Sequence, residues 1–304
     1  MALSPQKKYL AFAEETAQFG LIHVCDVSKR DDKRSKKSIE KKRTFLSLDC
    51  ASTKFTSLSF DYMEESRYLV AMSGEPDCRI IYWNWSSPKP MATLATNGFS
   101  KIYHAICQPG YEGSMLLLGN STLKSCKYTS GNELLKATNI TQTKNLKEQY
   151  SQNYTNYCWL YDGNLILATD KGELIYVIAH NMEMKYVLPT SPMEEITIEC
   201  MIPYSKGFIV GGSNATIYVY EKHDVEKKNQ YVRIDRKVQV PNNYSQVISM
   251  TLLQKEETLV FGLSDGSLLS LPFNFDRSSD EAIKFEPIVQ AFHTAEVLSY
   301  IYCA

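Results

Sequence analysis

The sequence predicts an all-β protein built from six repeats of one strand–turn–strand unit. In each repeat a short apolar strand is followed by a turn of small residues and a second apolar strand. These pairs begin roughly 40 to 60 residues apart, and no helical period is sustained between them. A strand-only repeat of this length is typical of the blades of a β-propeller. The first strands of the pairs are Tyr9–Ala13, Tyr68–Met72, Met115–Gly119, Leu165–Thr169, Phe208–Gly212 and Thr258–Gly262.

Each predicted blade changes polarity from its first strand to its last. A further apolar segment precedes each pair except the first, and a more polar segment, such as Tyr231–Val240, follows it. Turns such as Asp170–Gly172 and Ser264–Gly266 supply residues that tolerate the positive φ of tight hairpins. The predicted blades span residues 2–48, 55–95, 101–138, 153–189, 196–240 and 246–291, with an extra strand over 295–303, in one propeller domain over residues 1–304.

The two ends of this pattern do not balance. The first blade lacks a preceding apolar segment because the chain opens on Ala2–Tyr9, whereas Ala295–Tyr302 has the character of the first strand of a further blade. A propeller must close its ring or leave two sheet edges unpaired. Either the last strand completes a six-bladed ring, or this is part of a longer chain. We favour the second alternative because the pattern begins and stops partway through a blade.

Composition limits the class of protein and the environment. Apolar residues make up 44% of the 304 residues and charged residues 22%, as in soluble globular proteins. The net charge of −1 gives no general attraction to nucleic acid or to an anionic membrane. The sequence has no apolar run long enough to span a bilayer and no signal-peptide core. The eight scattered cysteines include no Cys-x-x-Cys pair, which favours reduced thiols in an intracellular protein.

Motifs of phosphate binding and of metal-dependent catalysis are missing from the sequence. No Gly-x-x-x-x-Gly-Lys loop and no His-Glu-x-x-His pair occurs. The five histidines lie far apart and have no second ligand at metal spacing. The sequence therefore predicts a protein that is not an enzyme and uses no metal or cofactor. An active site built at the mouth of a propeller channel from several blades stays open as an alternative.

The most distinctive local feature is a basic stretch, residues 29–43, between two predicted strands of the first blade. Nine Lys and Arg residues here oppose three acidic ones, so the remainder of the chain is net acidic. Several cations acting together attract an acidic partner, either an acidic protein surface or nucleic acid. The alternative is a solvated loop whose lysines keep an edge strand from pairing with another chain. The candidate contacts are Lys29, Arg30, Lys33, Arg34, Lys36, Lys37, Lys41, Lys42 and Arg43.

Trp85 is a second candidate for contact with a partner. Trp and Tyr side chains are frequent anchors of interfaces. Trp83, two residues earlier, is expected to pack between neighbouring blades. Strand alternation places Trp85 on the same face but nearer the loop, so packing and partner binding are both open for it.

Particular residues resemble the WD-repeat superfamily, although most of its signatures are eroded. Trp83-Asn84, Cys25-Asp26 and Tyr220-Glu221 stand where a Trp-Asp pair would close the third strand of a repeat. More specifically, the chain is similar to the N-terminal propeller of the cilia- and flagella-associated WD-repeat family numbered 57. The residues that carry this similarity are Ser4-Pro5 with Tyr9, Ser66–Leu69, Ile81–Trp85, Pro90–Ala92, Ala168–Leu174, Tyr204–Phe208 and Glu256–Val260.

The resemblance implies a non-enzymatic protein of the ciliary axoneme. Members of that family carry two tandem propellers, the first with seven blades, and then a long coiled coil, and they help to place inner dynein arms on doublet microtubules. This chain shows no second propeller and no heptad segment, and it lacks the first strands of the family's first propeller. A role that depends on the coiled coil is therefore not carried over.

We therefore predict a degenerate WD-repeat propeller that serves as a protein-interaction platform on the axoneme, on the cytoplasmic side, near inner dynein arms. The implied partners are the tubulin doublet surface, components of the inner dynein arm or of the regulatory complex, and a longer paralogue. We expect neither nucleic acid nor membrane insertion. The rival interpretation is a generic intracellular WD-repeat scaffold of a non-ciliary complex.

Overall fold

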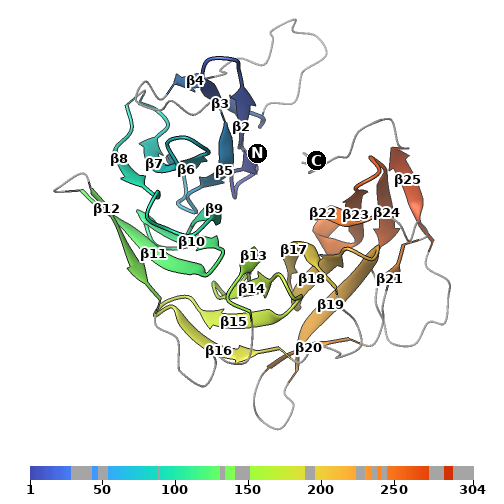
Figure 1. Cartoon of the computed structure of the whole chain (residues 1–304). Coiled ribbons are helices and arrows are strands. Elements are labelled where there is room, and N and C mark those ends of the chain that lie inside the picture. The colour runs from blue at the N-terminus through green and yellow to red at the C-terminus, as the bar shows by residue number, and fades with distance from the viewer. Residues whose placement is uncertain are drawn as a thin grey trace, which may run out of the picture. The chain divides into compact units, whose positions relative to one another are not determined.

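The computed structural model describes an all-β chain that forms two compact units, residues 1–140 and 141–302. Each unit contains three antiparallel sheets (Figure 1). In the described residues the only helical element is a 3-10 turn at Gln254–Glu256. Residues described are 1–28, 43–46, 54–87, 89–130, 134–140, 151–188, 196–223, 230–234, 238–240, 245–273 and 284–289. The predicted fold class is confirmed, with six blade-like sheets.

Each sheet of the first unit is a four-stranded meander in which consecutive strands pair. The first sheet contains β1 (Ala2–Leu3), β2 (Tyr9–Glu15), β3 (Gly20–Asp26) and β4 (Arg43–Leu46). The second contains β5 (Phe55–Phe60), β6 (Tyr68–Ser73), β7 (Arg79–Asn84) and β8 (Ala92–Ala95). The third contains β9 (Ile102–Cys107), β10 (Ser114–Gly119), β11 (Thr122–Thr129) and β12 (Leu134–Asn139).

The second unit repeats this meander three times. Its first sheet contains β13 (Tyr154–Trp159), β14 (Leu165–Thr169), β15 (Leu174–Ile178) and β16 (Glu183–Val187). Its second contains β17 (Ile198–Tyr204), β18 (Gly207–Gly212), β19 (Thr216–His223), β20 (Gln230–Arg233) and β21 (Val238–Gln239). Its third contains β22 (Val247–Leu253), β23 (Thr258–Leu263), β24 (Leu268–Pro272) and β25 (Glu286–Val289). The predicted polar strand Tyr231–Val240 is thus two short strands, β20 and β21, both paired with β19.

The first sheet has a first strand that the sequence analysis did not expect. Ala2 and Leu3 form β1 and pair with Ala11 and Leu10 of β2. The expectation that the first blade lacks its opening strand is therefore wrong. A two-residue strand is too short to show a hydrophobic period, so backbone pairing places it where no sequence pattern could.

The second strand is almost fully buried in five of the six described sheets, and β2 is the exception. All residues of β10, β14 and β18 are buried, and so are all but the first residue of β6 and β23. Both faces of these strands are covered, which explains why their sequences are continuous apolar runs without alternation. The fourth strands differ: in β8, Thr93 and Ala95 are exposed. The predicted change in polarity across a blade is confirmed for this sheet.

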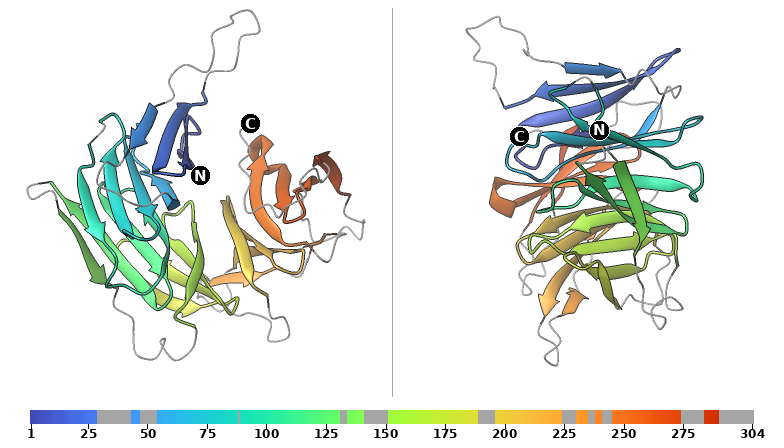
Figure 2. Two further views of the ribbon diagram at one scale, coloured as in Figure 1. Left: turned by 45° about the horizontal axis from the view of Figure 1, so that its top comes forward. Right: turned by 90° about the vertical axis from the view of Figure 1, so that its left-hand side faces the viewer.

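The sheets of each unit lie side by side (Figure 2). Apolar clusters join neighbouring sheets within each unit. Ile22 of β3, Leu69 of β6 and Trp83 of β7 share one cluster between the first two sheets. Trp83 is 1% exposed, which confirms its predicted core position. Burying one such side chain fully stabilises the fold by about 1.5–3 kcal/mol, so the sheets of a unit hold one another in place.

A β-bulge occurs near the start of the first strand in five of the sheets. The register there skips one residue, at Thr56, Tyr103, Thr155, Glu199 and Ile248. The residue after the bulge then faces the next sheet in three cases. The Ser57 hydroxyl accepts the Ala105 N–H at 3.2 Å, the Asn156 amide donates to the Glu199 carbonyl at 2.6 Å, and the Cys200 thiol donates to the Val247 carbonyl at 3.1 Å.

The turn between the first two strands has one backbone conformation in five sheets. One or two positions before the second strand begins, a residue has a positive φ, between 44° and 80°. Only two of these residues are glycines, so the fold imposes the left-handed conformation on side chains that disfavour it. The five residues are Lys7, Ser66, Gly113, Gly163 and Glu256.

The six described cysteines, at positions 25, 78, 107, 126, 158 and 200, are free thiols. Cys107 and Cys126 are buried, and burial raises the pKa of each thiol to about 12. Such thiols stay protonated and behave as small apolar side chains. The prediction that the cysteines form no disulfide framework is confirmed for these six.

We expect Gly119→Ala to destabilise the first unit by about 2 kcal/mol or more. A Cβ at Gly119 would lie 2.1 Å from the Lys101 carbonyl oxygen and 2.7 Å from the Ile102 Cα, so β9 and β10 would have to separate. Gly98→Ala is the matched control, because a Cβ there meets nothing within 4 Å. Denaturant unfolding of both variants checks this, and equal stabilities would contradict the described pairing of β9 with β10.

We expect Asp61→Asn to stabilise the protein increasingly as the pH rises from about 4 to 7. Asp61 is 4% exposed, and its Oδ1 accepts the Tyr68 N–H at 3.0 Å. Burial raises its carboxyl pKa to about 6. The folded state therefore favours the protonated acid, and ionisation above the unfolded pKa costs stability until the pH passes the folded pKa.

Unfolding at a series of pH values would measure this dependence. The gain of the Asn variant over the unmodified chain should be small near pH 4 and level off above pH 7. A gain that does not change with pH would show that Asp61 does not titrate in this range.

Candidate functional site

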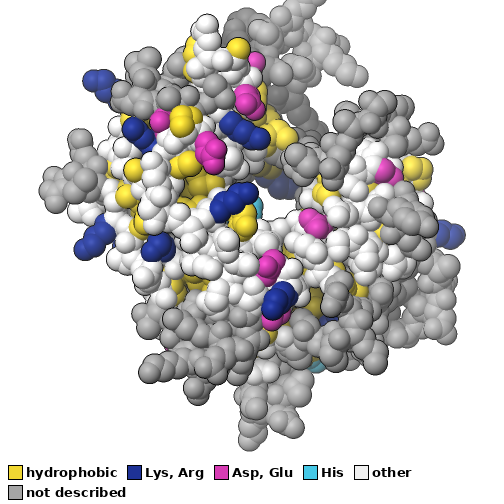
Figure 3. All heavy atoms as spheres, in the orientation of Figure 1, with side chains coloured by type: hydrophobic (Ala, Val, Ile, Leu, Met, Phe, Trp, Pro, Cys, Tyr) yellow, Lys and Arg dark blue, Asp and Glu magenta, His cyan; other side chains and the backbone are white. Residues whose placement is uncertain are grey.

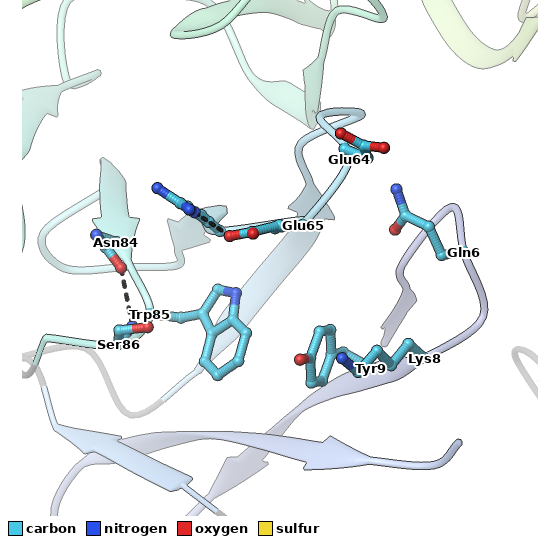
Figure 4. Close-up of a pocket in the computed structure, with 9 residues that line it drawn as sticks. Gln6, Lys8, Tyr9, Glu64, Glu65, Asn84, Trp85 and Ser86 are labelled. Atoms are coloured by element: carbon cyan, nitrogen blue, oxygen red, sulfur yellow. Dashed lines mark hydrogen bonds and ion pairs between the residues drawn. The ribbon is translucent and has the colours of Figure 1, made fainter.

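A cavity of about 530 Å³ lies in the first unit, where loops of its first two sheets meet. The loop between β1 and β2, the loop between β5 and β6 and the segment that follows β7 each contribute side chains (Figure 4). The residues that line it are Gln6, Lys8, Tyr9, Glu64, Glu65, Arg67, Asn84, Trp85 and Ser86, and we call it the Trp85 pocket.

Trp85 forms a wall of this pocket and is half-buried. Its backbone N–H donates to the Arg67 carbonyl at 3.2 Å, which holds the residue beside the start of β6. Directly after it the chain turns, because the Asn84 side chain accepts the Ser86 N–H at 3.0 Å. The indole ring lies 4.7 Å from the Tyr9 ring, centroid to centroid, at an interplanar angle of 59°. Trp85 therefore packs on the apolar cluster and lines the pocket at the same time.

Ser66 does not line the pocket, but its hydrogen bonds fix the pocket's geometry. It is fully buried, with a φ of 44°, and its carbonyl accepts the indole N–H of Trp85. Its hydroxyl donates to the Gln6 side-chain oxygen, and the Gln6 amide nitrogen donates to the Met63 carbonyl at 2.9 Å. These bonds tie the loop of the first sheet to the loop of the second, so contacts within the protein hold the shape of the pocket.

Charged groups of both signs line the pocket. Arg67 forms an ion pair with Glu65, and the guanidinium holds the pKa of that carboxyl below its usual range. The Lys8 ammonium lies 5.0 Å from the centroid of the Tyr9 ring, and a hydrogen bond to the Tyr9 side chain raises the lysine pKa. Figure 3 shows acidic and basic side chains interspersed with hydrophobic ones over β2 and β5–β7. All these charged groups are exposed, so each ion pair stabilises the fold little.

The structure places one of the sequence-predicted contact residues in this pocket, namely Trp85. Lys29, Arg30, Lys33, Arg34, Lys36, Lys37, Lys41 and Lys42 lie outside the described residues. Arg43 begins β4 and pairs with Val24, and its side chain also lies outside the description.

The segment that precedes the basic stretch lies beside the pocket. The Val27 N–H donates to the Lys8 carbonyl at 2.8 Å, just before the described residues end at Ser28. Sequence reasoning missed Tyr9 and Glu64 as pocket residues, and Ser66 as the residue that ties the pocket's loops together. The Ser4-Pro5 and Ser66-Arg67 patterns marked these two turns, but no pattern shows that turns some 60 residues apart meet across two sheets.

Residues 262–266 contain a sequence pattern that also occurs at catalytic sites. Gly262–Gly266 has the Gly-x-Ser-x-Gly spacing of a hydrolase nucleophile elbow, which joins a strand to a helix. Here the stretch joins β23 to β24 in a hairpin turn. The Ser264 hydroxyl accepts the Gln246 N–H at 3.0 Å, and Asp265 accepts the Ser245 hydroxyl at 3.1 Å. The stretch thus ties the turn to the segment before β22.

Two further searches of the described part of the chain gave no site. Within it, no group of three or more His, Cys, Asp or Glu side chains is arranged to hold a metal ion. The same residues include no helix with the length and apolar character needed to span a membrane.

Comparison with known proteins finds two named relatives of this chain. No protein-family profile matches it. It is 33% identical over 272 residues to cilia- and flagella-associated protein 57 A of Tetrahymena thermophila, a match that covers 87% of this chain and 21% of that protein. It is 22% identical to cilia- and flagella-associated protein 57 of Mus musculus, over 100% of this chain and 27% of that protein. The chain therefore spans about a quarter or less of the length of these relatives.

Solved structures with a similar fold are WD-repeat propellers. The β-propeller domain of Myceliophthora thermophila Cps50 (Swd1) superposes with a TM-score of 0.64 at 15% identity, over 89% of this chain and 81% of that chain. The WD40 repeats of RRP9 superpose with a TM-score of 0.59 at 13% identity, over 87% and 72%. At such identities the likeness shows the fold alone. The chain is thus a WD-repeat β-propeller protein of the kind found in cilia- and flagella-associated protein 57.

Proposed function

We propose that this protein is a non-catalytic adaptor of the ciliary axoneme, a protein-interaction platform on doublet microtubules near inner dynein arms. The observation that carries the proposal is the 33% identity, over 87% of this chain, to a relative named for cilia and flagella. The same kind of name recurs for the mouse relative. Because the chain covers only part of both relatives, the role assigned here is that of the propeller region.

The fold supports the binding part of the proposal. In five of the six described sheets the second strand is enclosed, so chemistry available to a partner lies mainly in the loops and outer strands. The Trp85 pocket is one such place, with a half-buried Trp and Tyr pair beside charged groups, the composition typical of interface anchors.

The basic stretch supports a contact with an acidic partner, for which the tubulin surface is our candidate. Its cations, Lys29 to Arg43, follow the described residues beside Lys8, on a chain whose remaining charge is negative. Contacts of this type mainly raise the association rate and weaken with salt. The alternative, that these lysines only protect a strand edge, predicts no such salt dependence.

The second candidate function is a generic intracellular WD-repeat scaffold of a non-ciliary complex. It is favoured by the solved structures, which share the propeller fold at 13–15% identity, because the fold serves many functions. Location separates the two candidates. The endogenous protein, tagged and followed through detergent extraction of cilia, should stay with the axoneme if the first proposal holds. Absence from cilia would leave the second.

We expect the basic stretch to set the salt concentration at which axonemes release the protein. Replacing Lys33, Lys36, Lys37 and Lys41 by Gln should lower the salt concentration needed for release, because four fewer cations meet the acidic partner. The matched control replaces four exposed lysines elsewhere, Lys127, Lys136, Lys171 and Lys206, with the same change in net charge. Identical release curves for both variants would overturn the assignment of this stretch as a contact.

A further inference from the structure

Most polar groups of the Trp85 pocket are already used within the protein. The Arg67 guanidinium is paired with Glu65, and the Lys8 ammonium is held by Tyr9. The Trp85 indole N–H donates to Ser66, and the Gln6 amide bonds through both of its ends. These groups hold the pocket in shape and offer few unused donors to a ligand.

The groups that remain available favour a cation. Glu64 is exposed and forms no ion pair or hydrogen bond with any described residue, so its carboxylate is free to accept. The Trp85 ring presents a π face, which attracts a positive charge, whereas the Tyr9 ring already has the Lys8 ammonium 5.0 Å from its centroid. In Figure 4 Glu64 and Glu65 lie on one side of the space and the two rings on another. A cationic group between the carboxylates and the Trp85 ring would meet both together.

We propose that the Trp85 pocket binds an arginine side chain presented by a partner protein. This inference rests on the proposed function, that the chain binds protein partners. A guanidinium is planar and weakly hydrated, so it stacks on an indole while its N–H fork donates to carboxylates. A cavity of about 530 Å³ holds the side chain and its adjacent backbone.

An acidic side chain fits the same space poorly. It would approach the free carboxylate of Glu64 and would compete with Glu65 for Arg67. Arg67 is already paired with Glu65, and the Lys8 ammonium already lies 5.0 Å from the centroid of the Tyr9 ring. Because the loops are tied together through Gln6 and Ser66, the aromatic wall and the carboxylates keep their spacing without a ligand, which reduces the entropy lost on binding.

The test uses the full chain and two blocked tripeptides, acetyl-Gly-Arg-Gly-amide and its citrulline counterpart, which has nearly the same shape but no charge. Binding is followed by the fluorescence of the tryptophans and by NMR shifts of the peptide. We expect saturable binding of the arginine peptide, about tenfold tighter than that of the citrulline peptide, because only the former makes charge-assisted and cation–π contacts.

Two variants locate the binding site. Glu64→Gln should weaken binding of the arginine peptide by about 3- to 10-fold, because an exposed carboxylate is lost while the fold is untouched. Glu75→Gln is the matched control, since Glu75 is an exposed carboxylate of the same unit, in the turn between β6 and β7 and outside the pocket. Trp85→Phe should weaken binding less than Glu64→Gln, because Phe keeps an aromatic face but is a poorer cation acceptor.

Several outcomes would overturn the inference: equal binding of the two peptides, equal effects of Glu64→Gln and Glu75→Gln, tighter binding of acetyl-Gly-Glu-Gly-amide, or no saturable binding of the arginine peptide. These outcomes are separate from the proposed ciliary function, which the extraction of axonemes tests with the unmodified chain. A protein retained on axonemes that ignores the arginine peptide would refute the ligand and keep the function.

Discussion

Neighbouring sheets within each unit are held in register by contacts between their first strands, and the bulge in those strands makes these contacts possible. A regular strand would point Ser57, Asn156 and Cys200 along the pleat of their own sheet. The skipped residue turns each of them toward the backbone of the next first strand, where it forms a hydrogen bond. A partly buried polar group that is satisfied in this way favours one relative position of two sheets, which apolar packing alone leaves loose.

The Trp85 pocket depends on that fixed relation between the first two sheets of the unit. Its parts come from a turn of one sheet and two loops of the other, and none of the three segments encloses a space alone. Ser66 links the parts of the pocket through three hydrogen bonds. Its carbonyl accepts the Trp85 indole N–H, its hydroxyl donates to the Gln6 side-chain oxygen, and its N–H donates to the Met63 carbonyl. The left-handed backbone of this serine is a strained conformation, of the kind that the surrounding packing must hold in place.

Much of the fold could be predicted from the sequence because hairpins are local: an apolar run, a turn and a second run lie within some 15 residues. Alternation placed Trp83 and Trp85 on one face, with Trp83 expected in the core and Trp85 nearer the loop. Other features depend on contacts that no local pattern encodes. The strand at Ala2–Leu3 is too short for a period, and the pocket joins Gln6 to Met63 across two sheets. The contacts assigned to residues 29–43 stay a prediction.

The loss of most WD-repeat signature residues has a structural explanation, which the first two sheets show. Ser4 lies in the turn before β2, and Asp61 lies in the equivalent turn before β6. Each side chain accepts the backbone N–H of the tyrosine that opens the following strand, Tyr9 for Ser4 and Tyr68 for Asp61. A hydroxyl and a carboxylate therefore do the same structural work with different residue types. The left-handed position of these turns is likewise filled by Lys7 in one and by Ser66 in the other. What the fold requires is an acceptor and a backbone conformation, so the sequence can drift to 13–15% identity with solved propellers while the geometry persists. The same freedom lets one copy of the turn acquire the Trp85 pocket: Ser66 serves the fold through its φ and serves the site through its hydroxyl and carbonyl.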